Sequence, residues 1–102
     1  MKLHINNRAK WIGKRHNYDY YDWEVYVDEG DAVLDSIDYV VYVLHKTFPD
    51  PVRTMKNRDD RFALRSRGWG EFDLRITAYF KDGSYERLLY SLDLSKEWND
   101  SG

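Results

Sequence analysis

Hydrophobic and polar residues alternate most regularly in the last third of the chain. Apolar or aromatic side chains occupy every second position in residues 72–80, and again in residues 88–94. A period of two places these side chains on one face of a strand. Between the two runs, residues 81–84 contain an Asp-Gly pair, which can adopt the positive φ angles of a tight turn. The pattern predicts a β-hairpin with one buried face.

Shorter runs of the same kind predict further strands upstream. Trp23, Val25 and Val27 alternate with polar or amphipathic neighbours. Residues 37–44 are apolar on both faces, which predicts a central strand covered on each side. A first strand begins at residues 3–5, and residues 9–12 either continue it or form a second one.

The whole pattern favours one all-β domain. Residues 62–64 mark another short strand, and no stretch sustains a 3.6-residue period, so little helix is expected beyond a turn near residues 32–33. Six to eight short strands separated by Gly, Pro and Asp turns predict an immunoglobulin-like β-sandwich of two antiparallel sheets. We assign the domain to residues 1–95 and expect residues 96–102 to form a polar, frayed C-terminal tail.

Composition supports this fold and narrows the setting. Hydrophobic residues make up 42% of the 102-residue chain and aromatic residues 17%, which suits one core in a β protein. The chain lacks cysteine, and its apolar runs are shorter than the roughly 20 residues of a membrane span. We expect a monomer in the cytoplasm, or in the nucleus if the source is eukaryotic, with no membrane partner.

Charge is distributed in two blocks. Residues 19–38 carry eight acidic side chains and no Lys or Arg, whereas residues 53–67 carry six basic ones beside Asp59 and Asp60. The blocks are either two solvated loop regions, or an acidic region that attracts a cationic peptide. The formal net charge of −2 makes a nucleic-acid partner unlikely, because nucleic-acid binders usually carry a basic excess.

Sequence signatures of catalysis are missing. The three histidines have no partner at metal-ligand spacing, and adjacent acids such as Asp59-Asp60 are usually just solvated. Gly68-Trp69-Gly70 lacks the Lys and the following helix of a phosphate-binding loop. We therefore predict no enzyme activity, no metal and no cofactor.

Two loops place large aromatic residues at strand ends beside Gly or Pro. One contains His-Lys-Thr-Phe-Pro-Asp-Pro (residues 45–51), and the other contains Gly-Trp-Gly-Glu-Phe (residues 68–72). Such positions make side chains available to a ligand. Alternatively, Phe48 and Trp69 simply cap the core of the sandwich.

Taken together, the loops resemble the signature of the YEATS domain family. His-x-Thr-Phe-Pro is followed about twenty residues later by Gly-Trp-Gly-x-Phe, and Asp22-Trp23-x-Val25-x-Val27 resembles the family's second strand. The likeness runs from about Leu3 to Leu94. Pro-Asp-Pro-Val-Arg and the Lys-Asp-Gly hairpin look like bacterial members, and the Pro-Pro pair of nuclear members is absent between the loops.

The resemblance implies an all-β module that reads acetylated or crotonylated lysine. By position, Phe48 and Trp69 would form two walls of a narrow slot for the flat acyl-amide. The backbone N–H of Trp69 would donate to the acyl carbonyl, and the Thr47 hydroxyl would accept from the acyl-lysine N–H. His45 would hold the loop of Thr47, and Phe72 would close the rear of the slot.

Other positions carry smaller expectations. Gly68 and Gly70 would let the backbone approach the ligand closely. A third aromatic would come from the loop before the second strand, residues 16–21, where Tyr18 or Tyr20 fits; alternatively, these tyrosines cover a sheet edge. The expected partner is an acyl-lysine-bearing peptide or protein.

Two other functions stay open. The chain could be a protein-interaction or scaffold domain of a bacterial signalling or defence protein that keeps the fold without acyl-lysine binding. A nucleic-acid contact could also use the basic block, through its four arginines from Arg58 to Arg67.

Overall fold

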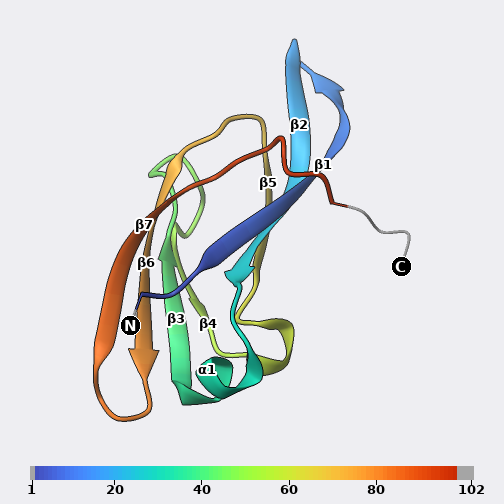
Figure 1. Cartoon of the computed structure of the whole chain (residues 1–102). Coiled ribbons are helices and arrows are strands. Elements are labelled where there is room, and N and C mark those ends of the chain that lie inside the picture. The colour runs from blue at the N-terminus through green and yellow to red at the C-terminus, as the bar shows by residue number, and fades with distance from the viewer. Residues whose placement is uncertain (1, 99–102) are drawn as a thin grey trace.

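The computed structural model describes residues 2–98, which form two stacked antiparallel sheets (Figure 1). The elements are β1 Ile5–Arg15, β2 Tyr18–Val27, α1 Asp31–Ser36, β3 Ile37–Val43, β4 Val52–Met55, the 3-10 turn η1 Arg58–Asp60, β5 Leu64–Gly68, β6 Asp73–Phe80 and β7 Tyr85–Ser91. One sheet has the order β1-β2-β5, and the other has the order β4-β3-β6-β7. These seven strands and one short helix confirm the predicted immunoglobulin-like sandwich.

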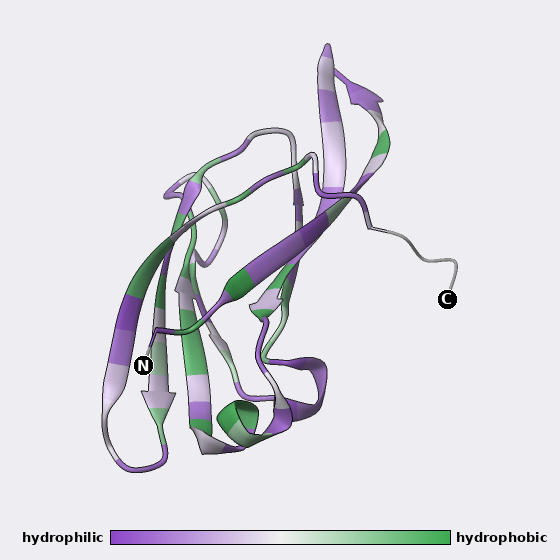
Figure 2. Ribbon diagram, viewed as in Figure 1, coloured by the Kyte–Doolittle hydropathy of each residue, from purple (hydrophilic) through white to green (hydrophobic). Residues whose placement is uncertain are grey.

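The core lies between the sheets and follows the predicted alternation. Trp23, Val25 and Val27 of β2 face Leu74 and Ile76 of β6, and all five are at most 1% exposed. Figure 2 shows hydrophobic bands alternating with hydrophilic ones along these strands. The side chains that a period of two placed on one face are therefore the ones that exclude water.

The β6–β7 hairpin and its turn are confirmed, although β7 covers Tyr85–Ser91 and so begins and ends three residues before the predicted run 88–94. The N–H of Gly83 donates to the carbonyl of Phe80 at 3.0 Å, and Gly83 has φ +90°. The N–H of Phe80 in turn donates to the carbonyl of Ser84 at 2.9 Å, which closes a three-residue loop. The glycine of the Asp-Gly pair supplies the positive φ that this turn requires.

The prediction for residues 37–44 is correct in one respect and wrong in another. β3 is a central strand between β4 and β6, as expected, but only one of its faces is buried. On the other face, Tyr39 stacks on Tyr79 with ring centroids 4.7 Å apart, and Val41 is half-buried. Aromatic and β-branched neighbours within the sheet shield this face, so no third layer is needed.

A single strand, β1, covers both segments that the pattern left open, and with β2 it extends beyond the sandwich. β5 pairs only with Tyr21–Val25 of β2, so the end of the hairpin is two-stranded (Figure 1). We call residues 13–20 the arm. His16 and Asn17 form its turn with φ +50° and +69°. The expected loop before the second strand is therefore mostly strand.

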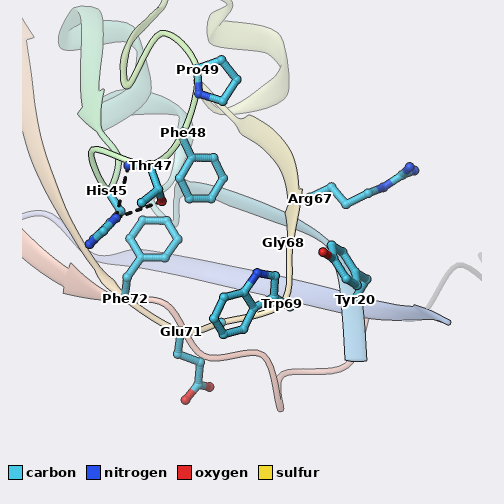
Figure 3. A pocket seen from close by; sticks show the side chains of 11 residues that line it. Tyr20, His45, Thr47, Phe48, Pro49, Arg67, Gly68, Trp69, Glu71 and Phe72 are labelled. Carbon is cyan, nitrogen blue, oxygen red and sulfur yellow. Dashed lines mark hydrogen bonds between the residues drawn. The ribbon is translucent and has the colours of Figure 1, made fainter. Parts of the chain in front are cut away.

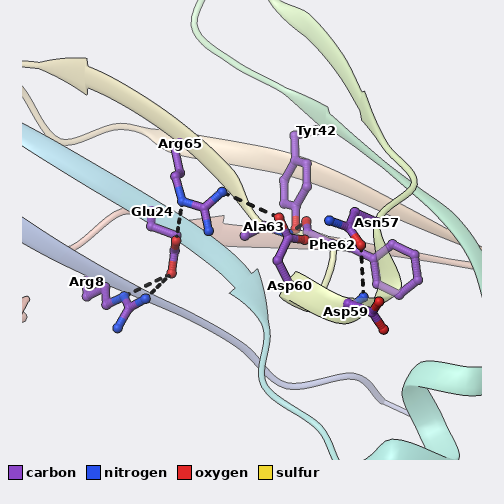
Figure 4. A network of polar contacts seen from close by, with 9 residues as sticks. All are labelled: Arg8, Glu24, Tyr42, Asn57, Asp59, Asp60, Phe62, Ala63 and Arg65. Atoms are coloured by element: carbon purple, nitrogen blue, oxygen red, sulfur yellow. Dashed lines mark hydrogen bonds and ion pairs between the residues drawn. The ribbon is translucent and has the colours of Figure 1, made fainter. Parts of the chain in front are cut away.

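The two charge blocks pair with each other. Four arginines of residues 58–67 contact acidic side chains of residues 22–35: Arg67 with Asp22 at 2.7 Å, Arg65 with Glu24 at 2.6 Å, Arg61 with Asp28 at 3.7 Å, and Arg58 with Asp31 at 3.1 Å and Asp35 at 2.6 Å. Glu24 is buried between Arg8 and Arg65 (Figure 4). The blocks thus serve mainly to join β2 and α1 to the β5 region, which neither interpretation anticipated.

Asn7 ties the first strand to the end of the last one. This side chain is 2% exposed, and its amide donates to the carbonyl of Asp93 at 2.8 Å. Its oxygen accepts from the N–H of Asp93 at 3.1 Å and from the Tyr90 hydroxyl. Burial raises the pKa of Tyr90 to about 12, so this hydroxyl stays a donor at neutral pH.

Part of the expected frayed tail is docked. The carbonyl of Lys96 accepts from the N–H of Ala9 at 2.7 Å, and the N–H of Trp98 donates to the carbonyl of Ala9 at 2.8 Å. Arg8 lies 4.7 Å from the ring centroid of Trp98. Residues 96–98 therefore lie along β1, and the rest of the tail, residues 99–102, falls outside the described residues.

Candidate functional site

All eight residues proposed from the sequence line one cavity of about 590 Å³ at an end of the sandwich (Figure 3). They are Tyr20, His45, Thr47, Phe48, Gly68, Trp69, Gly70 and Phe72. They come from the arm, from the loop between β3 and β4, and from the end of β5 with the segment that follows it. Segments far apart in sequence thus meet in one place.

The first loop is held in a defined shape. The N–H of Leu44 donates to the carbonyl of Pro51 at 2.7 Å, which closes the loop at its base. Arg53 donates to the carbonyls of Asp50 and Pro49 at 2.6 and 2.8 Å, so a side chain from β4 braces the turn. This bracing fixes the position from which Phe48 enters the cavity.

His45 and Thr47 form a pair within this loop. Nδ1 of His45 lies 2.9 Å from the Thr47 hydroxyl oxygen, and the N–H of Thr47 donates to the same nitrogen at 3.3 Å. A nitrogen that accepts from an N–H carries no proton, so the hydroxyl must also donate to it. The oxygen of Thr47 then keeps its lone pairs for another donor. The expectation that His45 holds the Thr47 loop agrees with this contact.

Phe48 and Phe72 rest on a buried aromatic floor. Their ring centroids lie 5.2 Å apart, and both meet the ring of Trp23 edge-on at 6.4 and 5.9 Å. A Cβ on Gly68 would lie 3.6 Å from Cζ of Phe48, which is an ordinary van der Waals contact, and a Cβ on Gly70 would meet open space. The packing within the protein itself therefore does not require glycine at either position.

Trp69 forms an exposed side of the cavity. It is 53% exposed, and its ring stacks on Tyr18 with centroids 4.3 Å apart. In Figure 3, Thr47 and Phe48 lie above, and Trp69 and Phe72 lie below. The ladder between β2 and β5 ends at the Tyr21–Gly68 pair, so strand pairing does not continue to the N–H of Trp69.

The structure separates the two tyrosines that sequence reasoning could not. Tyr20 lines the cavity, whereas Tyr18 supports Trp69 from its other side, next to a second cavity. The two tyrosines lie two residues apart in β2, so strand alternation alone would place them on the same face, and periodicity does not distinguish them. Neither acts solely as a cover for a sheet edge.

Three further lining residues were not proposed from the sequence: Pro49, Arg67 and Glu71. The N–H of Leu94 donates to Glu71 at 2.8 Å, and Arg67 donates to Asp22 at 2.7 Å. Each directly adjoins one of the two signature loops or lies inside one. Their position in or beside a signature loop was the signal in the sequence that could have identified them as lining residues.

No metal centre or membrane span stands out in the described part of the chain. Within residues 2–98, His, Asp and Glu side chains do not gather in groups of three or more that could hold a metal ion. Among the same residues, the structure contains no helix with the length and hydrophobicity that crossing a bilayer requires.

Comparisons with known proteins point to the same family as the two signature loops. Residues 21–93 match the family model described as the prokaryotic YEATS domain. Protein AF-9 homolog of Candida glabrata is 41% identical over 69 residues, and transcription initiation factor TFIID subunit 14 of Schizosaccharomyces pombe is 40% identical over 71 residues. These matches cover 66% and 69% of this chain, but only 30% and 28% of the relatives. The chain thus spans about a third of the length of these curated relatives.

Solved structures give the same result. The crystal structure of yeast AF-9 homolog protein Yaf9 has a TM-score of 0.71 and 31% identity, covering 88% of this chain and 68% of that one. The Yaf9 YEATS domain bound to H3K27ac has a TM-score of 0.66 and 29% identity, covering 92% of this chain and 77% of that one. The fold, the paired loops and the family match together show that this chain belongs to the YEATS domain family and matches its prokaryotic branch.

Proposed function

We propose that this domain is a non-catalytic reader of acylated lysine, and that the 590 Å³ cavity holds the acyl-lysine side chain of a peptide. The observation that carries the proposal is that the two signature loops and the arm bring all eight expected residues to one cavity. A Yaf9 YEATS domain that recognises H3K122suc peptide shares the fold, with a TM-score of 0.68 and 27% identity.

The polar groups of the cavity suit an amide. Leaving an amide without hydrogen bonds on burial costs about 1–3 kcal/mol, so a reader must offer one donor and one acceptor. The Thr47 oxygen, whose proton is directed to His45, is the acceptor for the acyl-lysine N–H. The N–H of Trp69, beyond the end of the β2–β5 ladder, is the donor for the acyl carbonyl.

The aromatic walls suit a flat acyl group. Phe48 and Trp69 present ring faces to a planar amide, and such contacts contribute roughly 0.5–1.5 kcal/mol beyond area burial. A planar, unsaturated crotonyl group therefore gains more than an acetyl group. Unmodified lysine is rejected, because its ammonium would lose water, and Glu71, the carboxylate that lines the cavity, already accepts from the N–H of Leu94.

Calorimetric titration of crotonyl-, acetyl- and unmodified lysine peptides into the protein and two variants tests the proposal. Trp69→Ala removes one wall, and we expect affinity for crotonyl-lysine to fall at least about tenfold with little change in the melting temperature. Trp11→Ala is the matched control, because Trp11 is also exposed, at 58%, but does not line the cavity. It should bind like the parent.

Two results would contradict the proposal. Equal binding of modified and unmodified lysine would remove acyl recognition altogether. Failure of every acyl peptide to bind, together with capture of a partner protein that ignores Trp69→Ala, would favour the scaffold alternative.

A further inference from the structure

A small cationic cavity adjoins the candidate acyl-lysine cavity. It measures about 160 Å³ and is lined by Ile12, Gly13, Lys14, Arg15, Tyr20 and Arg67. Tyr20 and Arg67 also line the acyl-lysine cavity, so the two spaces share a wall. A peptide that places its acyl-lysine in the larger cavity would therefore pass close to the smaller one. We call the smaller one the arm pocket.

The arm pocket exists because of a glycine in a bulge. Gly13 pairs with Tyr20 across the arm, and the β1–β2 register shifts between Trp11 and Gly13. Gly13 has φ +130°, and a Cβ built on it would meet nothing within 4 Å. The partner position of Tyr20 is thus left open, and bulges of this kind often lie beside functional sites.

Of the two arginines that line the arm pocket, Arg67 belongs to the paired charge blocks and Arg15 does not. Asp22 accepts from Nε of Arg67 at 2.7 Å and is the only carboxylate bonded to that side chain among the described residues. The described residues offer Arg15 no ion pair, although it is exposed on the arm. The arm pocket thus has two guanidinium groups, of which one is paired with a carboxylate among the described residues.

The charge changes sign on the far side of Trp69. There a wider cavity of about 550 Å³ is lined by Asp19 and Glu71 with Tyr18 and Tyr21. Asp19 accepts from Nε1 of Trp11 at 3.1 Å, and Glu71 from the N–H of Leu94 at 2.8 Å, each through one carboxylate oxygen. A bound peptide thus meets positive charge on one side of the acyl-lysine and negative charge on the other.

From this arrangement we propose that the arm pocket binds an acidic side chain, Asp or Glu, of the same peptide that carries the acyl-lysine. The proposal rests on the proposed function and adds a flanking preference to it. Arg15 is the specificity-determining residue, and Arg67 contributes the guanidinium nitrogens that Asp22 leaves free. Arginine suits this role because its planar fork matches a carboxylate.

A peptide scan can test the flanking preference. Each crotonyl-lysine peptide of the set carries one Glu, placed at one of the four positions before or the four positions after the modified lysine. Each is compared with the peptide that has Gln at the same position. We expect Glu to raise affinity roughly two- to fivefold on one side only, the range of a single solvent-exposed charge pair. On the other side, where Asp19 and Glu71 lie, Glu should give no gain or a loss.

Variants connect the preference to Arg15. Arg15→Gln should abolish the Glu advantage, and Arg15→Lys should keep part of it. The matched control is Lys81→Gln, because Lys81 is an exposed cation at the β6–β7 turn and lines neither cavity. It should leave the Glu advantage unchanged.

The outcomes separate this inference from the function on which it rests. If crotonyl-lysine is preferred over lysine but Glu and Gln flanks bind equally, the inference fails and the proposed function stands. If no crotonyl-lysine peptide binds, both fail. If a single-stranded RNA oligonucleotide binds more tightly than every Glu peptide and loses affinity with Arg15→Gln, the arm pocket contacts nucleic acid and the inference is overturned.

Discussion

Two tryptophans at the same end of the molecule differ in almost every physical respect. Trp23 is fully buried beneath the candidate cavity, where its ring meets Phe48 and Phe72 edge-on. Trp69 is 53% exposed at the side of that cavity and rests only on Tyr18 among the ring contacts of the described residues. The ring of Trp23 forms the buried floor on which the lining residues Phe48 and Phe72 rest, and the ring of Trp69 forms part of the cavity's rim.

The difference separates what stabilises the fold from what is left for a ligand. At the floor, Trp23, Phe48 and Phe72 are already in contact with each other, so the burial of these rings contributes to folding whether or not a ligand is bound. The rim exposes apolar surface that gains burial only when a partner covers it. Substitutions at the floor should therefore lower stability, and substitutions at the rim should lower binding.

The largest expected effect is at the floor. Trp23→Ala removes a large buried side chain and should lower the free energy of unfolding by about 3–5 kcal/mol, measured by urea denaturation. Trp69→Ala should lower it by less than about 1 kcal/mol, because an exposed ring buries little area on folding. Equal losses for the two variants would break the distinction between floor and rim.

The buried carboxylate of Glu24 gives the next largest effect. Glu24→Gln leaves Arg8 and Arg65 without their shared counter-charge, and should cost about 2 kcal/mol of stability. The value is below that of a fully buried pair, because both arginines are about half exposed. A denaturation midpoint unchanged by the substitution would show that this ion pair contributes nothing.

His45 should act on binding alone. His45→Ala removes the acceptor of the Thr47 proton, so affinity for crotonyl-lysine should fall by about 1 kcal/mol, or roughly fivefold. The denaturation curve should stay where it is, because this contact is exposed. Thr47→Ser keeps the hydroxyl and serves as the control; Thr47→Val should bind as weakly as His45→Ala.

The smallest expected effect is a loss of stability at acidic pH, caused by carboxylates that do not line the cavity. Hydrogen bonds from Ser84 and Ser95 lower the pKa of Asp82 and Asp93, respectively, and the backbone N–H of His4 lowers the pKa of Glu29. A lowered folded-state pKa stabilises the protein above the unfolded-state pKa, near 4, and the stabilisation is lost as pH falls through the folded value. Melting temperature should fall slightly between pH 5 and 3, and less steeply in Asp82→Asn.

The sequence predicts those elements whose apolar residues face a single partner sheet. The β6–β7 hairpin and the floor strand β2 alternate cleanly, so their buried faces follow from periodicity alone. The short edge strand β4 does not alternate in this way and was not assigned. The outer face of β3 misled the prediction, because aromatic pairing within one sheet looks the same in sequence as burial under another layer.

The site is predictable where a motif fixes residue types, and unpredictable where geometry selects between neighbours. His45, Thr47, Phe48 and Trp69 follow from the resemblance of the two loops to the family signature, and all four line the cavity. The turn at His16 and Asn17 lacks the Gly that usually marks a tight hairpin, so the arm was read as a loop. Without the arm, Tyr18 and Tyr20 could not be separated. The pairing of the charge blocks depends in part on the β2–β5 register, which sets Asp22 opposite Arg67 and Glu24 opposite Arg65 and cannot be read from periodicity.

The buried amide of Asn7 decides where this chain can be cut. The region that matches the family model, residues 21–93, excludes β1 and so omits the group that bonds Tyr90 and both backbone atoms of Asp93. In a fragment trimmed to those limits, the Tyr90 hydroxyl and the N–H and carbonyl of Asp93 would lose these hydrogen-bond partners. The sheet β1-β2-β5 would also lose its edge strand β1. Any shortened version intended for expression should therefore begin before Leu3, whose N–H is itself held by Glu86 of β7.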